Sequence, residues 1–192
     1  MKIIGTGSSL PQKVVTNDDL AAIMDTSDEW ISSRTGIRKR HIATTETTTS
    51  LAVEAVKAAL SDAGTDGSEI DLIIAASVTG DKIVPSLACQ IQAEIGADSA
   101  VAFDINAACS GFLFALATAD AYFKTGRFHK AVILGAEVLS KIWIGMIEVR
   151  VFFLEMERGL QLFQMKGIRL RLLYRGLTEQ VEKHLMQITA RY

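Results

Sequence analysis

Cysteine and proline are scarce in this sequence, with two of each among 192 residues. Cys89 and Cys109 do not have the spacing of a zinc knuckle or of a disulfide framework, so neither a metal site nor a disulfide is expected. Long apolar runs are also lacking. None reaches the roughly 18 residues of a membrane span, and the N-terminus has no apolar stretch of secretory length. We therefore expect a cytoplasmic protein without a membrane partner.

An excess of charge of either sign is absent as well. The 20 Lys and Arg residues nearly balance the 22 Asp and Glu residues, which gives a net charge of -2. Such a chain has no general electrostatic attraction for nucleic acid, so nucleic acid is not an expected partner. Hydrophobic residues make up 49% of the chain, which is typical of a globular protein with a sizeable core. The expected partners are small molecules or other proteins.

Short β-branched runs alternate with amphipathic helical stretches over residues 1–142, which predicts an α/β fold with helices packed on a sheet. The expected strands are Lys2 to Gly5, Leu72 to Ser77, Val101 to Ile105 and Ala131 to Gly135. Four side chains are expected to cap helices, those of Asn17, Ser27, Ser50 and Ser86. The stretch from Cys109 to Lys124 is apolar almost all round, which is typical of a buried central helix.

The composition changes abruptly after Ile142. Residues 143–192 contain no Asp, Asn, Ser, Pro or Cys and a single alanine, and their eight Lys or Arg residues outnumber five Glu. Caps and turns are built from the missing residue types, so the segment lacks the usual features of a compact fold. We predict a domain boundary here, with residues 143–192 as a separate tail. A basic amphipathic helix is the alternative interpretation of this tail.

Cys109 is the best candidate for a reactive side chain. It lies where an apolar strand ends and an apolar helix begins, and the free N–H groups at a helix N-terminus favour thiolate, the attacking form, over thiol. Its small neighbours Ala108 and Gly111 would let an acyl carbonyl approach the backbone, whose N–H groups can stabilise an oxyanion. From the residues alone, an inert buried thiol is the more common alternative, and we assign that role to Cys89.

Trp30 and Arg34 lie four residues apart, on one face of a short expected helix. An indole and a guanidinium on one face can hold an adenine ring by stacking, and the guanidinium can also meet a phosphate. The alternative is a core tryptophan whose edge is covered by the arginine. The basic run from Arg38 to His41 could meet phosphates or an acidic carrier protein, but its pattern favours a solvated surface.

Two sets of motifs resemble those of β-ketoacyl-acyl-carrier-protein synthase III, a family of the thiolase superfamily. One set surrounds Cys109 and consists of residues 106–112, Asn-Ala-Ala-Cys-Ser-Gly-Phe, with residues 85–92, Pro-Ser-Leu-Ala-Cys-Gln-Ile-Gln. The other is Asp-Glu-Trp-Ile at 28–31, followed by Arg-Thr-Gly-Ile at 34–37. The resemblance covers residues 1–142 and implies the N-terminal half of a thiolase-like fold, with helices packed on a mixed sheet.

The resemblance implies an acyltransferase of fatty-acid synthesis that uses acyl-coenzyme A as a substrate and no metal or cofactor. Cys109 would accept the acyl group, and Trp30 and Arg34 would bind the adenine end of coenzyme A. The acyl group would then condense with malonyl-acyl-carrier protein, with release of carbon dioxide. Family members use a His and an Asn of the C-terminal half for that step, and residues 143–192 carry no match to them. We therefore expect a condensation-incompetent chain from a family whose full-length members form homodimers.

The tail has a second interpretation in the genetic code. Reading Trp143 to Glu148 one base upstream forces an aspartate at two junctions and permits Val-Asp-Trp-Asn-Asp-Arg, and the same shift permits Cys-Val-Leu-Phe-Gly-Asp-Gly-Ala-Gly over residues 151–159. Both strings resemble synthase III sequence that follows this region. Our hypothesis is that residues 143–192 are frameshifted, and the DNA sequence across these codons tests it.

Two other functions remain open on the sequence. The chain can be a non-catalytic binding or dimerisation fragment that regulates a full-length relative, which co-purification would detect. It can also derive from a related thiolase-superfamily synthase with another acyl product. Thioester formation at Cys109 separates the enzymatic interpretation from the first of these alternatives.

Overall fold

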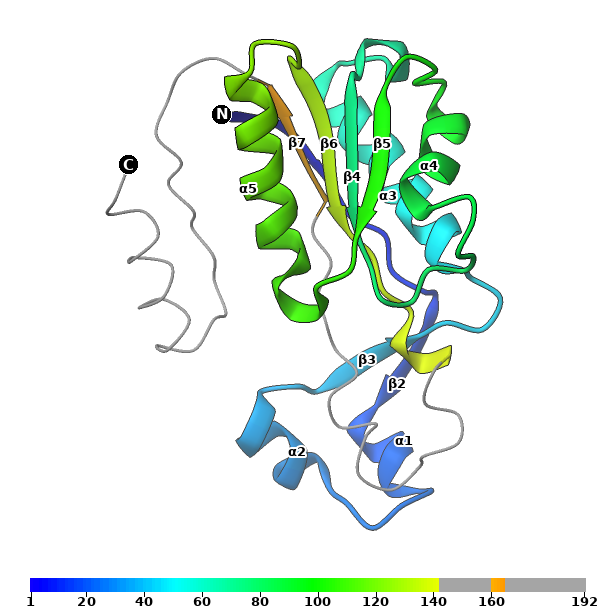
Figure 1. Cartoon of the computed structure of the whole chain (residues 1–192). Helices are drawn as coiled ribbons and strands as arrows, with labels where there is room; N and C mark the ends of the chain where they lie inside the picture. The colour runs from blue at the N-terminus through cyan, green and yellow to red at the C-terminus, as the bar shows by residue number, and fades with distance from the viewer. Residues whose placement is uncertain (142–159, 165–192) are drawn as a thin grey trace, which may run out of the picture.

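A five-stranded sheet forms the centre of the computed structural model, which describes residues 1–141 and 160–164 (Figure 1). The strand order is β1-β7-β6-β4-β5. The strands are β1 (Lys2–Gly7), β4 (Leu72–Ala76), β5 (Val101–Ile105), β6 (Lys130–Gly135) and β7 (Leu160–Gln164). β4 pairs in parallel with β5 and β6, whereas β7 runs antiparallel to β1 and β6. The predicted mixed sheet is confirmed.

Helices cover both faces of this sheet. α3 (Thr48–Ala63) and α4 (Leu87–Ile95) pack on one face, where α3 lies along β1 and α4 along β5. α5 (Gly111–Lys124) packs on the other face, over β4 and β6. Each side has its own apolar core, and every residue of β4 is buried because helices cover that strand on both faces.

A smaller unit lies at the end of the sheet where β4, β5 and β6 terminate (Figure 1). β2 (Lys13–Thr16) and β3 (Lys39–Ile42) form its antiparallel pair, with Lys13 opposite Ile42 and Thr16 opposite Lys39. Two short helices, α1 (Asn17–Ala21) and α2 (Asp28–Thr35), connect these strands. The N-terminal end of α5 is directed toward the same end of the molecule. Neither β2 nor β3 was among the expected strands.

Helix caps agree with the sequence at two of the four expected positions. Ser27 and Ser86 accept from the third residue of α2 and α4, respectively. The predicted caps Asn17 and Ser50 are wrong. Thr16 caps α1 together with Asp19, and Thr47 caps α3 together with Ser50, in reciprocal capping boxes. In both cases the N-cap lies upstream of the predicted residue. The Asn17 side chain bonds to Asp28 and Ile37, whereas the Ser50 side chain belongs to the capping box and accepts from the N–H of Thr47.

The prediction of a helix buried all round is wrong for α5. Its inner face is fully buried at Ala115 and Ala119, but Phe114 on its outer face is 55% exposed. The helix begins at Gly111, after a 3-10 turn over Ala108–Ser110. Two other 3-10 turns, Gly67–Glu69 and Leu139–Lys141, follow α3 and β6. Within the described part of the chain, no helix is long and apolar enough to cross a membrane.

Glu46 fastens the segment before α3 to the loop that follows β1. Its carboxylate accepts N–H bonds from Gln12 at 2.9 Å, Thr44 at 2.9 Å and Thr45 at 3.1 Å. These bonds, first of all that of Gln12, lower the pKa of Glu46 from 4.5 to about 2. Because the pKa is lower in the folded chain, the ionised carboxylate stabilises the fold above pH 4.5, and this contribution disappears as the pH falls toward 2.

We expect Glu46→Gln to lower the melting temperature at pH 7 and to lower it much less near pH 3. An amide oxygen replaces only part of the carboxylate's accepting capacity, and acid weakens the same bonds in the unmodified chain. Thermal unfolding of both chains across this pH range measures the difference. A gap that stays constant down to pH 3 would contradict the role of the ionised group.

Candidate active site

Cys109 lies on the 3-10 turn between the end of β5 and the start of α5, as predicted, and its side chain is exposed. Ala108 has a φ of 45°, in the left-handed region that residues other than glycine seldom adopt. Among the described residues, no side chain caps the N-terminus of α5. The thiol is therefore accessible on a sharp strand-to-helix turn, where first-turn N–H groups have no side-chain acceptor among the described residues.

Two contacts fix this turn against the sheet and α4. The Asp104 carboxylate, five residues before the cysteine, accepts 2.8 Å hydrogen bonds from the N–H groups of both Leu87 and Ala88 at the start of α4. On the other side, Gly111 lies so close to β4 that a Cβ there would be 3.0 Å from the Cβ of Ala76. The end of β5 and the start of α5 are thus held on either side of Cys109.

Trp30 and Arg34 lie together on α2, which confirms that they share a face. The guanidinium carbon of Arg34 is 4.6 Å from the centroid of the indole ring, and Nη1 of Arg34 donates to the carbonyl oxygen of Trp30 at 3.2 Å. Trp30 is 46% exposed, so it is not a core residue. Since the guanidinium lies over one face of the ring, a planar base that stacks on that face would displace Arg34.

An open depression of about 310 Å³ adjoins the indole and is lined by Asp25, Thr26, Ser27 and Trp30. This volume is at the lower end of the range for small-molecule sites, about 300 Å³ and above. The hydroxyl oxygen of Thr26 is buried and has no hydrogen-bond partner among the described residues. Thr26 is therefore a candidate contact that the sequence did not reveal, because threonine before a helix is a common turn residue.

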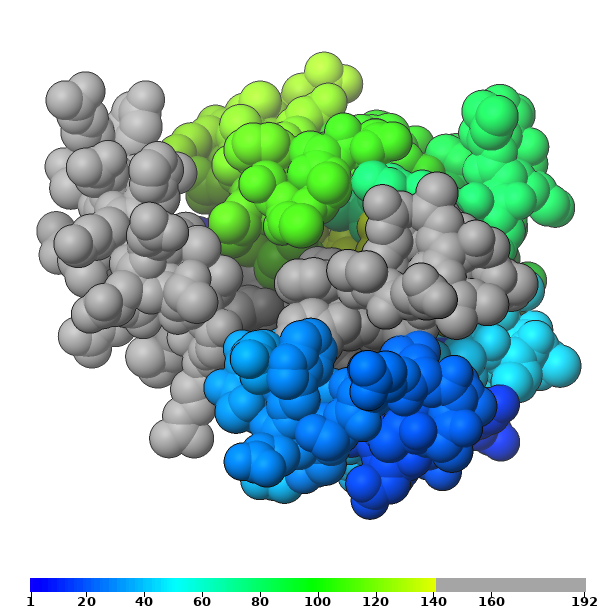
Figure 2. All heavy atoms as spheres, turned by 90° about the horizontal axis from the view of Figure 1, so that it is seen from below, coloured from blue at the N-terminus to red at the C-terminus, as the bar shows by residue number. Residues whose placement is uncertain are grey.

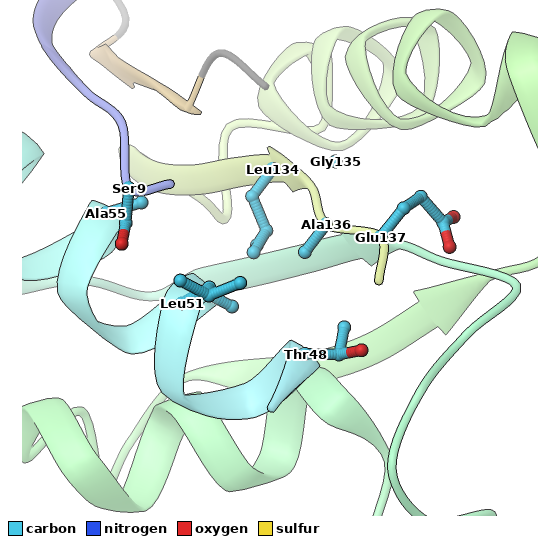
Figure 3. Close-up of a pocket in the computed structure, with 9 residues that line it drawn as sticks. Ser9, Thr48, Leu51, Ala55, Leu134, Gly135, Ala136 and Glu137 are labelled. Carbon is cyan, nitrogen blue, oxygen red and sulfur yellow. The ribbon is translucent and has the colours of Figure 1, made fainter. Parts of the chain in front are cut away.

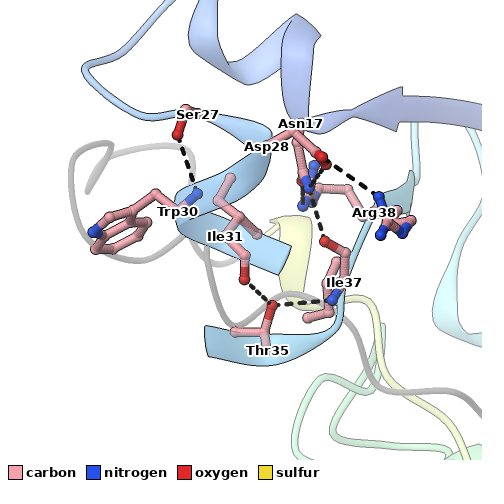
Figure 4. A network of polar contacts seen from close by, with 9 residues as sticks. Asn17, Ser27, Asp28, Trp30, Ile31, Thr35, Ile37 and Arg38 are labelled. Atoms are coloured by element: carbon pink, nitrogen blue, oxygen red, sulfur yellow. Dashed lines mark hydrogen bonds and ion pairs between the residues drawn. The ribbon is translucent and has the colours of Figure 1, made fainter. Parts of the chain in front are cut away.

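A polar network supports the other side of α2 (Figure 4). Asn17 donates from Nδ2 to Oδ1 of Asp28 at 2.7 Å and to the carbonyl oxygen of Ile37 at 2.8 Å. Its Oδ1 accepts from Nη2 of Arg40 at 2.5 Å. The prediction of a solvated basic run over residues 38–41 is therefore wrong at Arg40, which is 1% exposed. A buried guanidinium requires partners, and those partners are distant in sequence.

A second hollow is lined by α3 and the end of β6 (Figure 3). Ser9, Thr48, Leu51 and Glu137 are among its lining residues, and it has room for about 10 Å³, roughly one water molecule. Neither Cys109 nor Trp30 lines it, so we assign it no part in the site.

The remaining candidates have structural surroundings. Sγ of Cys89 is 3.7 Å from the carbonyl oxygen of Ala102, consistent with a packed thiol. Nδ1 of His41 lies 2.6 Å from the carbonyl oxygen of Pro11, and the exposed His129 is a partner of Asp71. No cluster of three or more potential metal ligands occurs in the described ranges.

Comparisons with known proteins agree with this architecture. A family profile for 3-oxoacyl-[acyl-carrier-protein] synthase III matches residues 103–152, which include Cys109. The chain is 55% identical, over 140 residues, to β-ketoacyl-[acyl-carrier-protein] synthase III of Streptococcus pneumoniae strain Hungary19A-6. This match covers 73% of the chain but 43% of the relative, so the chain spans less than half the length of that relative.

Solved structures give the same answer for the fold. Synthase III of Aquifex aeolicus VF5 aligns with a TM-score of 0.80 and 45% identity, over 88% of this chain and 55% of that one. The enzyme of Pseudomonas aeruginosa PAO1 aligns with a TM-score of 0.79 and 36% identity, over 86% of this chain and 51% of that one.

The fold is the N-terminal half of a thiolase-like fold, in which a turn presents a cysteine at a helix N-terminus. Over its matched residues, the chain belongs to the β-ketoacyl-acyl-carrier-protein synthase III family of fatty-acid synthesis, as its motifs predicted. The predicted boundary at Ile142 remains a prediction, because most of residues 143–192 lies outside the described part.

Proposed function

We propose that this chain accepts an acyl group from acyl-coenzyme A on Cys109, in the cytoplasm, with acyl-coenzyme A as substrate rather than resident cofactor. The observation that carries the proposal is the exposed thiol on the turn before α5, at a helix start that no described side chain caps. Family membership of the surrounding residues supports the same assignment.

The proposed transfer uses the Cys109 thiol, the backbone N–H groups of its turn and the thioester of acyl-coenzyme A. The Cys109 thiolate attacks the thioester carbonyl carbon, and backbone N–H groups of the turn donate to the oxyanion that forms. The carbon–sulfur bond to coenzyme A then breaks. Coenzyme A leaves as a thiolate and takes up a proton equivalent to the one that Cys109 released. The product is an acyl-cysteine thioester and free coenzyme A.

We assign the adenine end of coenzyme A to Trp30 and Arg34. The indole is 46% exposed and is an aromatic ring on which a base can stack, the adjoining depression has room for a base, and the guanidinium is a partner for phosphate. These residues act on binding and not on the reacting atoms, so their loss should raise the donor concentration required and leave the reactivity of the thiol intact.

Acylation by two donors tests this coenzyme A clamp, which consists of Trp30 and Arg34. We expect Trp30→Ala to weaken use of acetyl-coenzyme A by about tenfold, because stacking on an aromatic ring contributes about 1–3 kcal/mol per base. Acylation by S-acetyl-N-acetylcysteamine, which has no adenine, should be unchanged. Intact-protein mass spectrometry over time gives both rates. Equal slowing with the two donors would indicate general disruption and count against the clamp.

The condensing step is proposed for the whole family protein and not for these 192 residues. It joins the acyl group to malonyl-acyl-carrier protein and releases carbon dioxide, and full-length family members are proposed to act as homodimers with carrier protein as partner. Because residues 143–192 carry no match to the His and Asn motifs of that step, we propose that this chain stops at the acyl-cysteine. Formation of a 3-ketoacyl product from malonyl-carrier protein would contradict this.

One observation favours a second candidate, a dimerisation fragment that regulates a full-length relative. β5 is an edge strand of the described sheet, and Val101 on it is 45% exposed. Such an edge can pair with another chain. This alternative predicts co-purification with a full-length synthase III even for a Cys109→Ala variant that forms no thioester.

A further inference from the structure

We infer that Asn17 is a positioning residue for the coenzyme A clamp and acts through Asp28 at the start of α2; this inference rests on the proposed function. Asn17 is 1% exposed, and its side chain uses both its amide group and its oxygen. It does not cap α1, because Thr16 does. A buried amide therefore connects three segments of the small unit that are far apart in sequence.

The network contacts α2 near both of its ends. Asp28 is the first residue of α2, and Ile37 follows Gly36, the left-handed residue that closes the helix with a φ of 74°. Asn17 donates to Oδ1 of Asp28 and to the carbonyl oxygen of Ile37, at 2.7 and 2.8 Å. One side chain thus holds both ends of a helix of eight residues.

Arg40 holds Asn17 in the orientation that this contact requires. Nη2 of Arg40 donates to Oδ1 of Asn17, and Nη1 donates to the carbonyl oxygen of Val15 at 3.4 Å. With its oxygen facing a guanidinium, the Asn17 amide must direct its NH2 group toward Asp28 and Ile37. Arg38 contacts the other oxygen of Asp28 at 3.5 Å, but that pair is exposed and contributes little.

The clamp lies on the opposite side of the same helix. Figure 4 shows Trp30 pointing away from Asn17 and Asp28, so the network does not contact a ligand that stacks on the indole. Ile31 is the buried residue of α2, at 2% exposed, and Ser27 accepts from the N–H of Trp30 at 3.1 Å. Because α2 is short, rotation or fraying of its first turn would move Trp30 directly. The network therefore sets the indole's position without touching the donor.

The test measures coenzyme A binding by the full chain, by titration calorimetry, together with acylation of Cys109 by two donors. We expect Asn17→Ala to weaken coenzyme A binding by about tenfold, the size expected when buried partners lose a hydrogen bond. Its acylation by S-acetyl-N-acetylcysteamine should match the unmodified chain. Asp28→Ala should have the same effect as Asn17→Ala. Asp28→Asn, which retains an acceptor for Asn17, should bind within about threefold of the unmodified chain.

Thr48→Val is the matched control. Thr48 lies in α3, away from α2, and is also 1% exposed. Its hydroxyl donates to the carbonyl oxygen of Thr79 at 2.7 Å. This variant loses a buried hydrogen bond and should bind coenzyme A normally.

Unchanged coenzyme A binding in Asn17→Ala overturns the inference, and so does equal weakening in Thr48→Val. Failure of the proposed function looks different. In that case neither donor acylates Cys109 in the unmodified chain, while coenzyme A binding still depends on Asn17 and not on Thr48, which supports the positioning role.

Discussion

Cys109→Ser is expected to lose covalent acylation by acetyl-coenzyme A, with a rate reduced by at least about 10³-fold. A serine hydroxyl is almost entirely protonated at neutral pH and needs a general base to attack, and we assign no base to this turn. A thiol, in contrast, supplies some thiolate at neutral pH. Losses of this size and larger follow removal of an enzyme nucleophile. Intact mass after incubation with acetyl-coenzyme A reports the transfer, and peptide mapping locates the acyl group.

Cys89→Ser is the matched control for this experiment. Cys89 is half-buried on α4, and its sulfur contacts a backbone carbonyl, so its removal should leave the transfer rate unchanged. Coenzyme A binding should survive in both variants, because neither sulfur belongs to the clamp on α2. An acyl group found on Cys89, or acylation that persists in Cys109→Ser, would remove the basis for the proposed function.

The exposure of one face of α5 differs from the sequence prediction. The apolar stretch from Cys109 to Lys124 predicted a helix surrounded by protein, but only one face of α5 contacts the described sheet. Periodicity reports that a residue is apolar and cannot report which neighbour covers it. The position of Cys109 was predictable, since a strand, a run of small residues and a helix follow one another in sequence.

Only part of the proposed coenzyme A clamp was predictable from the sequence. The spacing of Trp30 and Arg34 placed them on one face of a helix, and the cation–π contact agrees. The support of that helix was not predictable. Asn17 offered an obvious local role as a cap, and Arg40 sat in a basic run, whereas their actual contacts join positions 23 residues apart. Such contacts depend on the pairing of β2 with β3, two strands of four residues each that give no alternating pattern of useful length.

Gly7→Ala is expected to destabilise the fold strongly. A Cβ at this position would lie 2.2 Å from the carbonyl oxygen of Ala55 and 2.6 Å from the backbone nitrogen of Ala59. Both atoms belong to the backbone of α3, so no side chain can rotate away. The helix must move off β1, and the apolar core between α3 and the sheet must open with it. We expect a loss of about 3 kcal/mol in the free energy of unfolding, at the upper end of overpacking effects.

Gly126→Ala separates this close approach from the intrinsic cost of replacing glycine. Gly126 has a φ of 75° and nothing within 4 Å of an added Cβ, so the change should cost about 1 kcal/mol for the left-handed backbone alone. Urea unfolding of the two variants gives both values directly. Because α3 packs on the face of the sheet opposite α5, the Gly7→Ala molecules that remain folded should still acylate Cys109 normally. Equal stability of the two variants would mean that α3 does not rest against β1 at this distance.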